Sequence, residues 1–331
     1  MEQTKIRLLR VLSILRESDE DHPITANQIV HQLSLYGMQA ERKAVLRDVS
    51  ALQDYGYDIL LHEDNKLGYY LASREFEDWE LKVIMDAVAG ASFLTSENSE
   101  SLCKRIAALA SKERQAVLRS ATPVFTSVKN GDPTTKNAID QLLTAIRKKK
   151  KVGFRYAFTG NDMEKHLRYD GAEYQISPYA LIWRLDRYYL IGNFERYKTL
   201  SYYRLDRIRA LRILDEPIVL MEELLGPNAD IQMKEYVNRN LNNYGGKRTR
   251  IRLRVDADMT DLLVDTFGSN FRIEKVIDNT MIISATVSDG WGLNAWLLQH
   301  GDSVEILEPE EIRKELVHLL DQISEKYHNQ N

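Results

Sequence analysis

Arginine and tyrosine side chains are concentrated in residues 176–211, where together they could bind an anion. A guanidinium group holds phosphate oxygens through two parallel N–H groups and stacks on flat rings, and a phenol adds a hydrogen-bonding hydroxyl. Because side chains alternate along a strand, Tyr202 and Arg204 are expected on one face and Arg207 on the other. Both arginines reach one pocket only if a bulge or the strand end intervenes; otherwise Arg207 pairs with Asp206 or with a backbone carbonyl.

The distribution of charge also marks this part of the chain. The 331 residues are 44% hydrophobic and 28% charged with a net charge of −4, which is ordinary for a globular protein of two or three domains. Residues 145–214, however, hold 16 Lys/Arg and 7 Asp/Glu, a net charge of +9 that leaves −13 for the rest. Such asymmetry indicates a nucleic acid or another anionic ligand, and the alternative is a solvated basic surface.

Residues 1–73 show the pattern of a small helical domain with a β-hairpin. Apolar side chains recur at helical spacing in three segments, and Thr25 can cap the second of them. The third helix is expected over residues 41–55, and a hairpin follows with strands at 59–61 and 68–71. Three helices with a tight turn before the third, followed by a hairpin, predict a winged helix-turn-helix.

The third predicted helix separates apolar from polar side chains. Val45 and Val49 fall on one face and must lie in the core. A helix of this kind in the major groove of DNA presents its outward N-terminal side chains to base edges and phosphates. Because residues 1–56 hold 7 Lys/Arg against 8 Asp/Glu, a domain used for protein contacts is the alternative. The predicted DNA-binding side chains are Arg42, Lys43, Arg47 and Ser50 on this helix and Lys66 in the hairpin turn.

The predicted organisation of the whole chain is α+β and multidomain. After the winged helix-turn-helix we expect a helical connector at 74–134, a small β-barrel at 135–225, and a ferredoxin-like α/β domain at 245–331. The strands expected in the barrel lie at Val152–Phe158, Tyr174–Trp183, Arg187–Phe194 and Leu200–Leu214, and a helix over Glu223–Leu241 follows them.

The third helix resembles that of the DeoR-type helix-turn-helix, which usually carries Arg-Arg-Thr-Ile-x-Arg-Asp. Arg42, Lys43, Arg47 and Asp48 match this pattern. Ala44 stands where the family usually has Thr, so one phosphate contact of the family is not expected here.

The basic segment resembles a WYL domain in the order of its motifs. Ser177-Pro178-Tyr179 comes first, then Tyr188-Tyr189-Leu190 in place of the Trp-Tyr-Leu triplet, then Arg204-Leu205-Asp206-Arg207-Ile208. The C-terminal region resembles the extension that usually follows such domains. The resemblance implies an Sm-like barrel that senses a nucleic-acid fragment or another anionic effector in a bacterial transcription factor. The effector-binding residues that it implies are Ser177, Tyr179, Tyr189, Tyr202, Arg204 and Arg207.

These features predict a homodimeric, cytoplasmic regulator of transcription that binds double-stranded operator DNA. The seven histidines have no metal-ligand spacing, and we expect no catalytic site, metal or cofactor. No segment is apolar enough to cross a membrane, and the single cysteine, Cys103, is expected in the core. The rival interpretation is an RNA- or single-stranded-DNA-binding or nucleic-acid-processing protein in which the Sm-like barrel is the main site.

Overall fold

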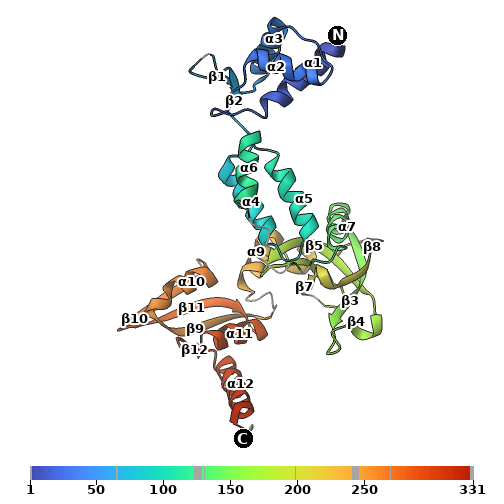
Figure 1. Ribbon diagram of the computed structural model, residues 1–331. Helices are drawn as coiled ribbons and strands as arrows, with labels where there is room; N and C mark the ends of the chain where they lie inside the picture. The colour runs from blue at the N-terminus through green and yellow to red at the C-terminus, as the bar shows by residue number, and fades with distance from the viewer. Residues whose placement is uncertain are drawn as a thin grey trace. The chain divides into compact units, whose positions relative to one another are not determined.

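The chain folds into two units of mixed α-helix and β-strand, Met1–Pro133 and Thr134–Asn331. One two-stranded sheet lies among the helices of the first unit, and the second holds a six-stranded and a four-stranded sheet. The computed structural model describes residues 2–64, 66–122, 129, 131–197, 199–240, 246–268 and 270–328 (Figure 1).

Three helices and a hairpin form residues 2–71, as the sequence predicts. The second helix begins where the Thr25 hydroxyl accepts a hydrogen bond from the Gln28 N–H, in a capping box. The third ends at Gly56, whose φ of 114° favours glycine. The elements are α1 (Glu2–Leu15), α2 (Ala26–Leu35), α3 (Arg42–Tyr55), β1 (Ile59–Leu61) and β2 (Tyr69–Leu71).

Three further helices complete the first unit and have a core of their own. They are α4 (Asp78–Gly90), α5 (Ser96–Ala107) and α6 (Lys112–Ser120). Cys103 is 5% exposed, as expected of a core thiol. Its neighbours in the cluster are Leu81, Met85, Ala107, Ala110 and Leu118.

Polar contacts join these helices to the first domain across the boundary that the sequence predicts at residue 73. The Asp19 side chain, 5% exposed, accepts hydrogen bonds from the Ser111 hydroxyl and from the His22 N–H. At the start of α6 the Lys112 N–H donates to the Glu17 carbonyl at 3.1 Å. The first turn of a helix has N–H groups without acceptors inside the helix, and here the loop after α1 supplies a carbonyl acceptor for one of them.

A curled antiparallel sheet follows the first helix of the second unit. Its strand order is β4-β3-β5-β6-β7, and β8 also pairs with β3. Aromatic rings fill the inside of the curl, where Phe154 and Tyr174 stack at 5.7 Å between centroids. Among the described residues no ladder joins β7 to β8, so the sheet is a half-barrel. The elements are α7 (Thr135–Lys148), β3 (Lys150–Thr159), β4 (Lys165–Leu167), η1 (Arg168–Gly171), β5 (Tyr174–Arg184), β6 (Arg187–Phe194), β7 (Leu200–Arg204), η2 (Leu205–Arg207) and β8 (Ile208–Pro217).

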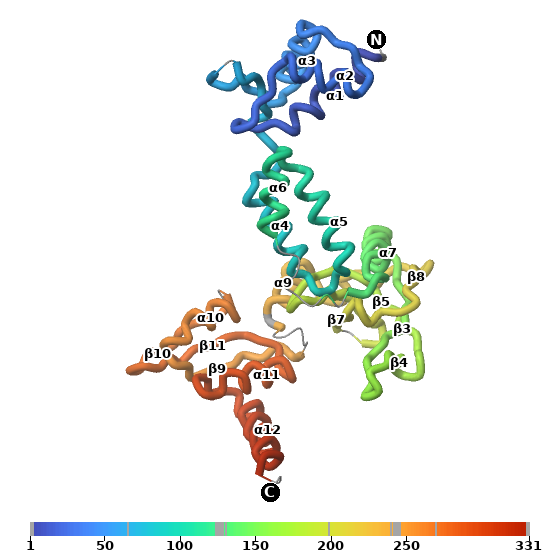
Figure 2. Tube along the Cα trace, viewed as in Figure 1, coloured from blue at the N-terminus to red at the C-terminus, as the bar shows by residue number. Residues whose placement is uncertain are grey.

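The prediction of one strand over Leu200–Leu214 is wrong. β7 pairs with β6, whereas β8 pairs with β3, so the chain has to leave one strand and reach another (Figure 2). The 3-10 turn η2 makes this change, and the guanidinium of Arg209, near the start of β8, donates to the Asp206 carbonyl in the turn at 3.0 Å. Strand alternation consequently ends at Arg204.

The helix predicted over Glu223–Leu241 is also divided, into α8 (Met221–Leu225) and α9 (Ala229–Arg239). Gly226 stands between them with a φ of 80°, and Pro227, which has no N–H for a helical hydrogen bond, follows it. Leu241 lies outside the described residues. Both helices pack on the sheet face opposite the aromatic core, through a cluster built around Ile191, Leu200 and Tyr236.

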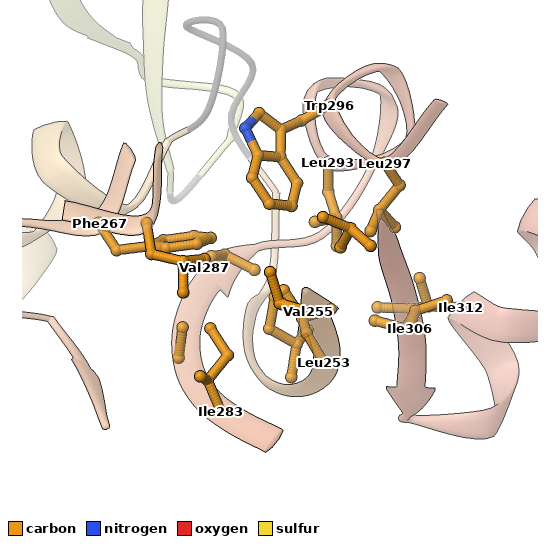
Figure 3. Close-up of a cluster of buried hydrophobic side chains, with 14 of the residues drawn as sticks. Leu253, Val255, Phe267, Ile283, Val287, Leu293, Trp296, Leu297, Ile306 and Ile312 are labelled. Atoms are coloured by element: carbon orange, nitrogen blue, oxygen red, sulfur yellow. The ribbon is translucent and has the colours of Figure 1, made fainter. Parts of the chain in front are cut away.

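A second antiparallel sheet, with helices packed on one face, forms the end of the chain. Its order is β10-β11-β9-β12. Ile251, Leu253 and Val255 of β9 are fully buried, and they pack with Phe267 and Trp296 from the helices (Figure 3). The elements are β9 (Arg248–Asp256), η4 (Ala257–Met259), α10 (Thr260–Phe267), β10 (Phe271–Ile277), β11 (Thr280–Ser288), α11 (Trp291–Gln299), β12 (Val304–Glu308) and α12 (Glu310–His328).

Candidate functional site

Helix α3 divides its side chains between the core and the solvent in the way the sequence predicts. Val45 is fully buried and Val49 is 2% exposed. The side chains on the outward face therefore lie free of the core, and three of them carry a positive charge. The exposed residues of this face are Arg42, Lys43, Arg47 and Ser50.

Asp48, which matched the helix-turn-helix pattern, faces inward instead. The Arg7 guanidinium donates to both of its carboxylate oxygens, from Nε at 2.7 Å and from Nη2 at 3.2 Å. The Asp48 side chain is 8% exposed and that of Arg7 is 20% exposed. This bidentate pair ties α3 to α1, so Asp48 orients the helix and does not contribute to its outer surface.

Lys66, the predicted contact in the hairpin turn, is exposed. Its N–H donates to the Asp64 carboxylate at 3.0 Å, which fixes the backbone of the turn. Glu63 and Asp64 beside it are exposed as well, so the turn carries more negative than positive charge.

In the half-barrel, Ser177 and Tyr179 bind the chain that follows β8. The Ser177 hydroxyl accepts a hydrogen bond from the Val219 N–H at 3.0 Å, and the Tyr179 hydroxyl donates to the Val219 carbonyl at 2.8 Å. Ser177 is 1% exposed, and burial raises the pKa of Tyr179 to about 12. Both side chains thus hold Val219 against β5 in this structure.

Tyr202 lies beneath α9. Its ring stacks on that of Tyr236 with 5.5 Å between centroids, and the Asn240 amide donates to its hydroxyl at 3.2 Å. Tyr189 meets the Tyr202 ring edge-on at 6.1 Å. The pairing of Tyr189 with Arg204 and of Ile191 with Tyr202 puts the two tyrosines on one face of the sheet, and α9 covers part of that face.

Arg204 is bound to Asp206 at the end of β7. Its Nε and Nη2 donate to the two carboxylate oxygens at 3.0 Å and 2.7 Å. Burial opposes ionisation of Asp206, but the hydrogen bonds and charge of Arg204 outweigh it and lower the pKa of the carboxyl. The side chains are 27% and 28% exposed, so the pair remains open to solvent.

Arg207 lies in the turn η2, where the strand has ended. The Arg204 N–H donates to the Tyr156 hydroxyl at 2.9 Å. Burial raises the pKa of Tyr156, and the charges of Arg207 and Arg204 partly oppose this rise. The charges of both arginines thus affect the pKa of one phenol, while the Asp206 carboxylate pairs with Arg204.

Arg168 joins this group and was not among the predicted site residues. Its guanidinium carbon is 5.9 Å from the centroid of the Tyr156 ring, which is within the range of a cation–π contact. A signal for it exists in the sequence, because Arg is followed by Tyr at four places in the basic segment. These pairs are Arg155-Tyr156, Arg168-Tyr169, Arg187-Tyr188 and Arg196-Tyr197.

Two features bear on other kinds of site. Within the described residues, no three His, Cys, Asp or Glu side chains gather as a metal ion would require. None of the helices in the described ranges is both long and apolar enough to cross a membrane.

Two family models match the second unit. Residues 137–213 match the WYL domain and residues 247–324 match the WCX domain. The first match confirms the resemblance of the basic segment, and the second identifies the C-terminal region. A search among curated proteins finds no match to the chain.

Two solved structures are distant likenesses of the chain. Proteasome accessory factor B/C (PafBC) of Arthrobacter aurescens is 18% identical with a TM-score of 0.29, over 95% of this chain and 48% of that chain. A CRISPR Cas-related protein is 10% identical with a TM-score of 0.40, over 93% of both chains. The chain thus spans about half the length of the Arthrobacter protein. At these TM-scores neither likeness extends to function.

Proposed function

We propose, from the WYL and WCX domains that its second unit matches, that the chain is a WYL-domain transcription regulator that binds DNA and senses an anionic effector. The observation that carries the DNA-binding part is the division of α3, whose valines lie in the core while Arg42, Lys43 and Arg47 are exposed. In this proposal residues 2–71 are a winged helix-turn-helix and α3 is its recognition helix.

The second unit supplies the sensor in this proposal. The half-barrel is the Sm-like fold of a WYL domain, and the strand order β10-β11-β9-β12 supports a ferredoxin-like classification for the C-terminal domain. Arg204 and Arg207 are the effector-binding residues best supported here, because the backbone N–H of Arg204 donates to the Tyr156 hydroxyl, the charge of Arg207 affects the pKa of the same group, and the Arg204 side chain is 27% exposed. A nucleic-acid fragment or nucleotide is the effector class that guanidinium and phenol groups would recognise.

Replacing Lys43 and Arg47 together by alanine should weaken duplex binding and leave the fold intact. Each phosphate contact that is lost should lower the slope of log K against log salt by about 0.9. Fluorescence anisotropy with a labelled mixed-sequence duplex at several salt concentrations measures this slope. Lys5→Ala, which removes an exposed charge from α1, is the matched control and should leave the slope near that of the wild type. Equal slopes for the double variant and the wild type would exclude α3 as the recognition helix.

The regulator is expected to be a homodimer at micromolar concentration, held by regions outside residues 1–72. A pseudo-two-fold operator needs a protein with a two-fold axis. Multi-angle light scattering of the full chain, alone and with duplex DNA, tests this assembly. A monomer under both conditions would contradict it.

A protein that binds RNA or single-stranded DNA through its half-barrel alone is the second candidate. It is favoured by the acidic turn beside Lys66 and by the 7 Lys/Arg against 8 Asp/Glu of residues 1–56. Footprinting on duplex DNA separates the two. Protection of a palindrome with half-sites one or more helical turns apart supports the regulator, and the absence of any duplex protection supports the alternative.

A further inference from the structure

Three arginines from separate segments surround Tyr156. Arg204, at the end of β7, donates its N–H to the phenol oxygen, and Arg207, in η2, is close enough for its charge to affect the same group. Arg168, at the start of η1, lies over the ring with 5.9 Å between its guanidinium carbon and the ring centroid. The curl of the sheet brings these segments together, since Tyr156 lies on β3, which contacts both turns.

Two of these guanidinium groups have hydrogen-bonding capacity to spare. Asp206 satisfies Arg204 with two hydrogen bonds. In the part of the chain that the structure describes, neither the Arg168 nor the Arg207 guanidinium makes a hydrogen bond or an ion pair. The three guanidinium groups outnumber the Asp206 carboxylate, which pairs with Arg204, and the Asp170 carboxylate in η1, so the charge of this group of side chains is positive. Planar guanidinium donors in this arrangement suit the oxygens of a phosphate group.

The turn that carries Arg168 has an unusual backbone. Tyr169 (φ 50°, ψ 50°) and Asp170 (φ 52°, ψ 29°) are both left-handed, and Gly171 continues the turn with a φ of 82°. Side chains other than glycine disfavour this region, and such strain gathers at functional sites. Tyr169 is 75% exposed and follows Arg168 directly in the sequence. Its ring centroid lies 6.4 Å from that of the Tyr174 ring.

On the basis of the proposed function, we propose that Arg168 and Tyr169 complete the effector site of the half-barrel. Arg168 binds a phosphate group of single-stranded nucleic acid together with Arg204 and Arg207, and Tyr169 stacks on the base next to that phosphate. An exposed ring beside a group of guanidiniums is the arrangement by which proteins hold single strands without reading their sequence. The strained turn serves to hold the ring in that position.

The test measures the affinity of the full chain for a labelled single-stranded oligonucleotide by fluorescence anisotropy. Arg168→Ala should weaken binding about tenfold or more, the effect of losing a charged hydrogen bond. Tyr169→Ala should weaken it by roughly fivefold to a hundredfold. The matched controls are Arg196→Ala and Tyr197→Ala, an exposed Arg-Tyr pair in the turn at the other end of the β6–β7 hairpin, and they should bind as the wild type does.

Competition separates the two roles and the possible sources of the phosphate. Inorganic phosphate and a nucleoside monophosphate should each displace the labelled oligonucleotide less well from Arg168→Ala than from the wild type. In Tyr169→Ala only displacement by the monophosphate should change. Circular dichroism shows whether each variant is folded. If Arg204→Ala loses affinity while folded Arg168→Ala and Tyr169→Ala match their controls, this inference is overturned and the proposed function stands. If the wild type binds none of these ligands, the effector part of the proposed function fails with it.

Discussion

Replacing Arg204 by alanine is expected to lower the affinity for a single-stranded oligonucleotide by about one to two orders of magnitude. This is the effect of losing a charged hydrogen bond to phosphate and part of the stacking between a base and a neighbouring ring. The variant would also leave the Asp206 carboxylate, 28% exposed, without its ion-pair partner. An unpaired carboxylate repels a phosphate, so this repulsion adds to the lost contact. Titration of the wild type and variant with the same labelled oligonucleotide measures the change.

Two companion variants test this explanation. Arg204→Lys should recover only part of the affinity, because lysine keeps the charge but loses the planar pair of donors. Asp206→Asn should raise the affinity several-fold, because a neutral amide competes less well with phosphate for the Arg204 guanidinium. Duplex binding by α3 should change little in all three variants. Equal oligonucleotide affinities across the series would show that the basic end of the half-barrel does not bind this ligand.

Replacing Asp48 by alanine is expected to destabilise the first domain by about 2–3 kcal/mol. Removing one member of a buried ion pair leaves the other without compensation, at a cost of roughly 3–5 kcal/mol when the partner is fully buried. Arg7 is 20% exposed and can reach water, which reduces that cost. The loss should appear as faster opening of α1 and α3, because this pair joins them.

Hydrogen exchange of the full chain measures this local stability. Amide exchange in α1 and α3 should become about thirtyfold to a hundredfold faster, while the sheets of the second unit should exchange as before. Asp54→Ala is the matched control, since Asp54 is an exposed carboxylate on the same helix. Unchanged exchange in the Asp48 variant would mean that the pair contributes nothing to the stability of α3.

Local signals in the sequence were sufficient for most of the secondary structure. Thr25 begins α2 and Gly56 ends α3, because capping depends on residues within one turn of the helix end. Strand β6 runs over Arg187–Phe194 as predicted, since its tyrosines and aliphatic residues favour a strand.

The elements that the sequence did not predict depend on distant partners. The break between β7 and β8 follows from their pairing with different strands, and no local pattern contains that information. β4 was missed because its residues, Lys165–Leu167, are all exposed and show no apolar alternation. Its pairing with β3 alone makes it a strand.

In the candidate site, too, local spacing predicted some features, and contacts between residues distant in the sequence decided the others. Helical spacing correctly placed Val45 and Lys43 on opposite sides of α3, because a helix face is set by spacing alone. Residue spacing could not show that the Ser177 hydroxyl accepts a hydrogen bond from Val219, which lies 42 residues away. It also could not bring Arg168 to Tyr156, because only the curl of the sheet does so.

The hydrogen bonds between the loop after α1 and the start of α6 decide where the chain can be cut. A fragment ending at residue 73 would lose Ser111 and Arg114, which both contact the Asp19 carboxylate, and would expose a charge that is now buried. A fragment ending at Pro133 keeps the whole cluster. A chimera that joins residues 2–71 to the sensor domain of another protein should therefore also include α4, α5 and α6. The part of the chain to transfer is the whole first unit.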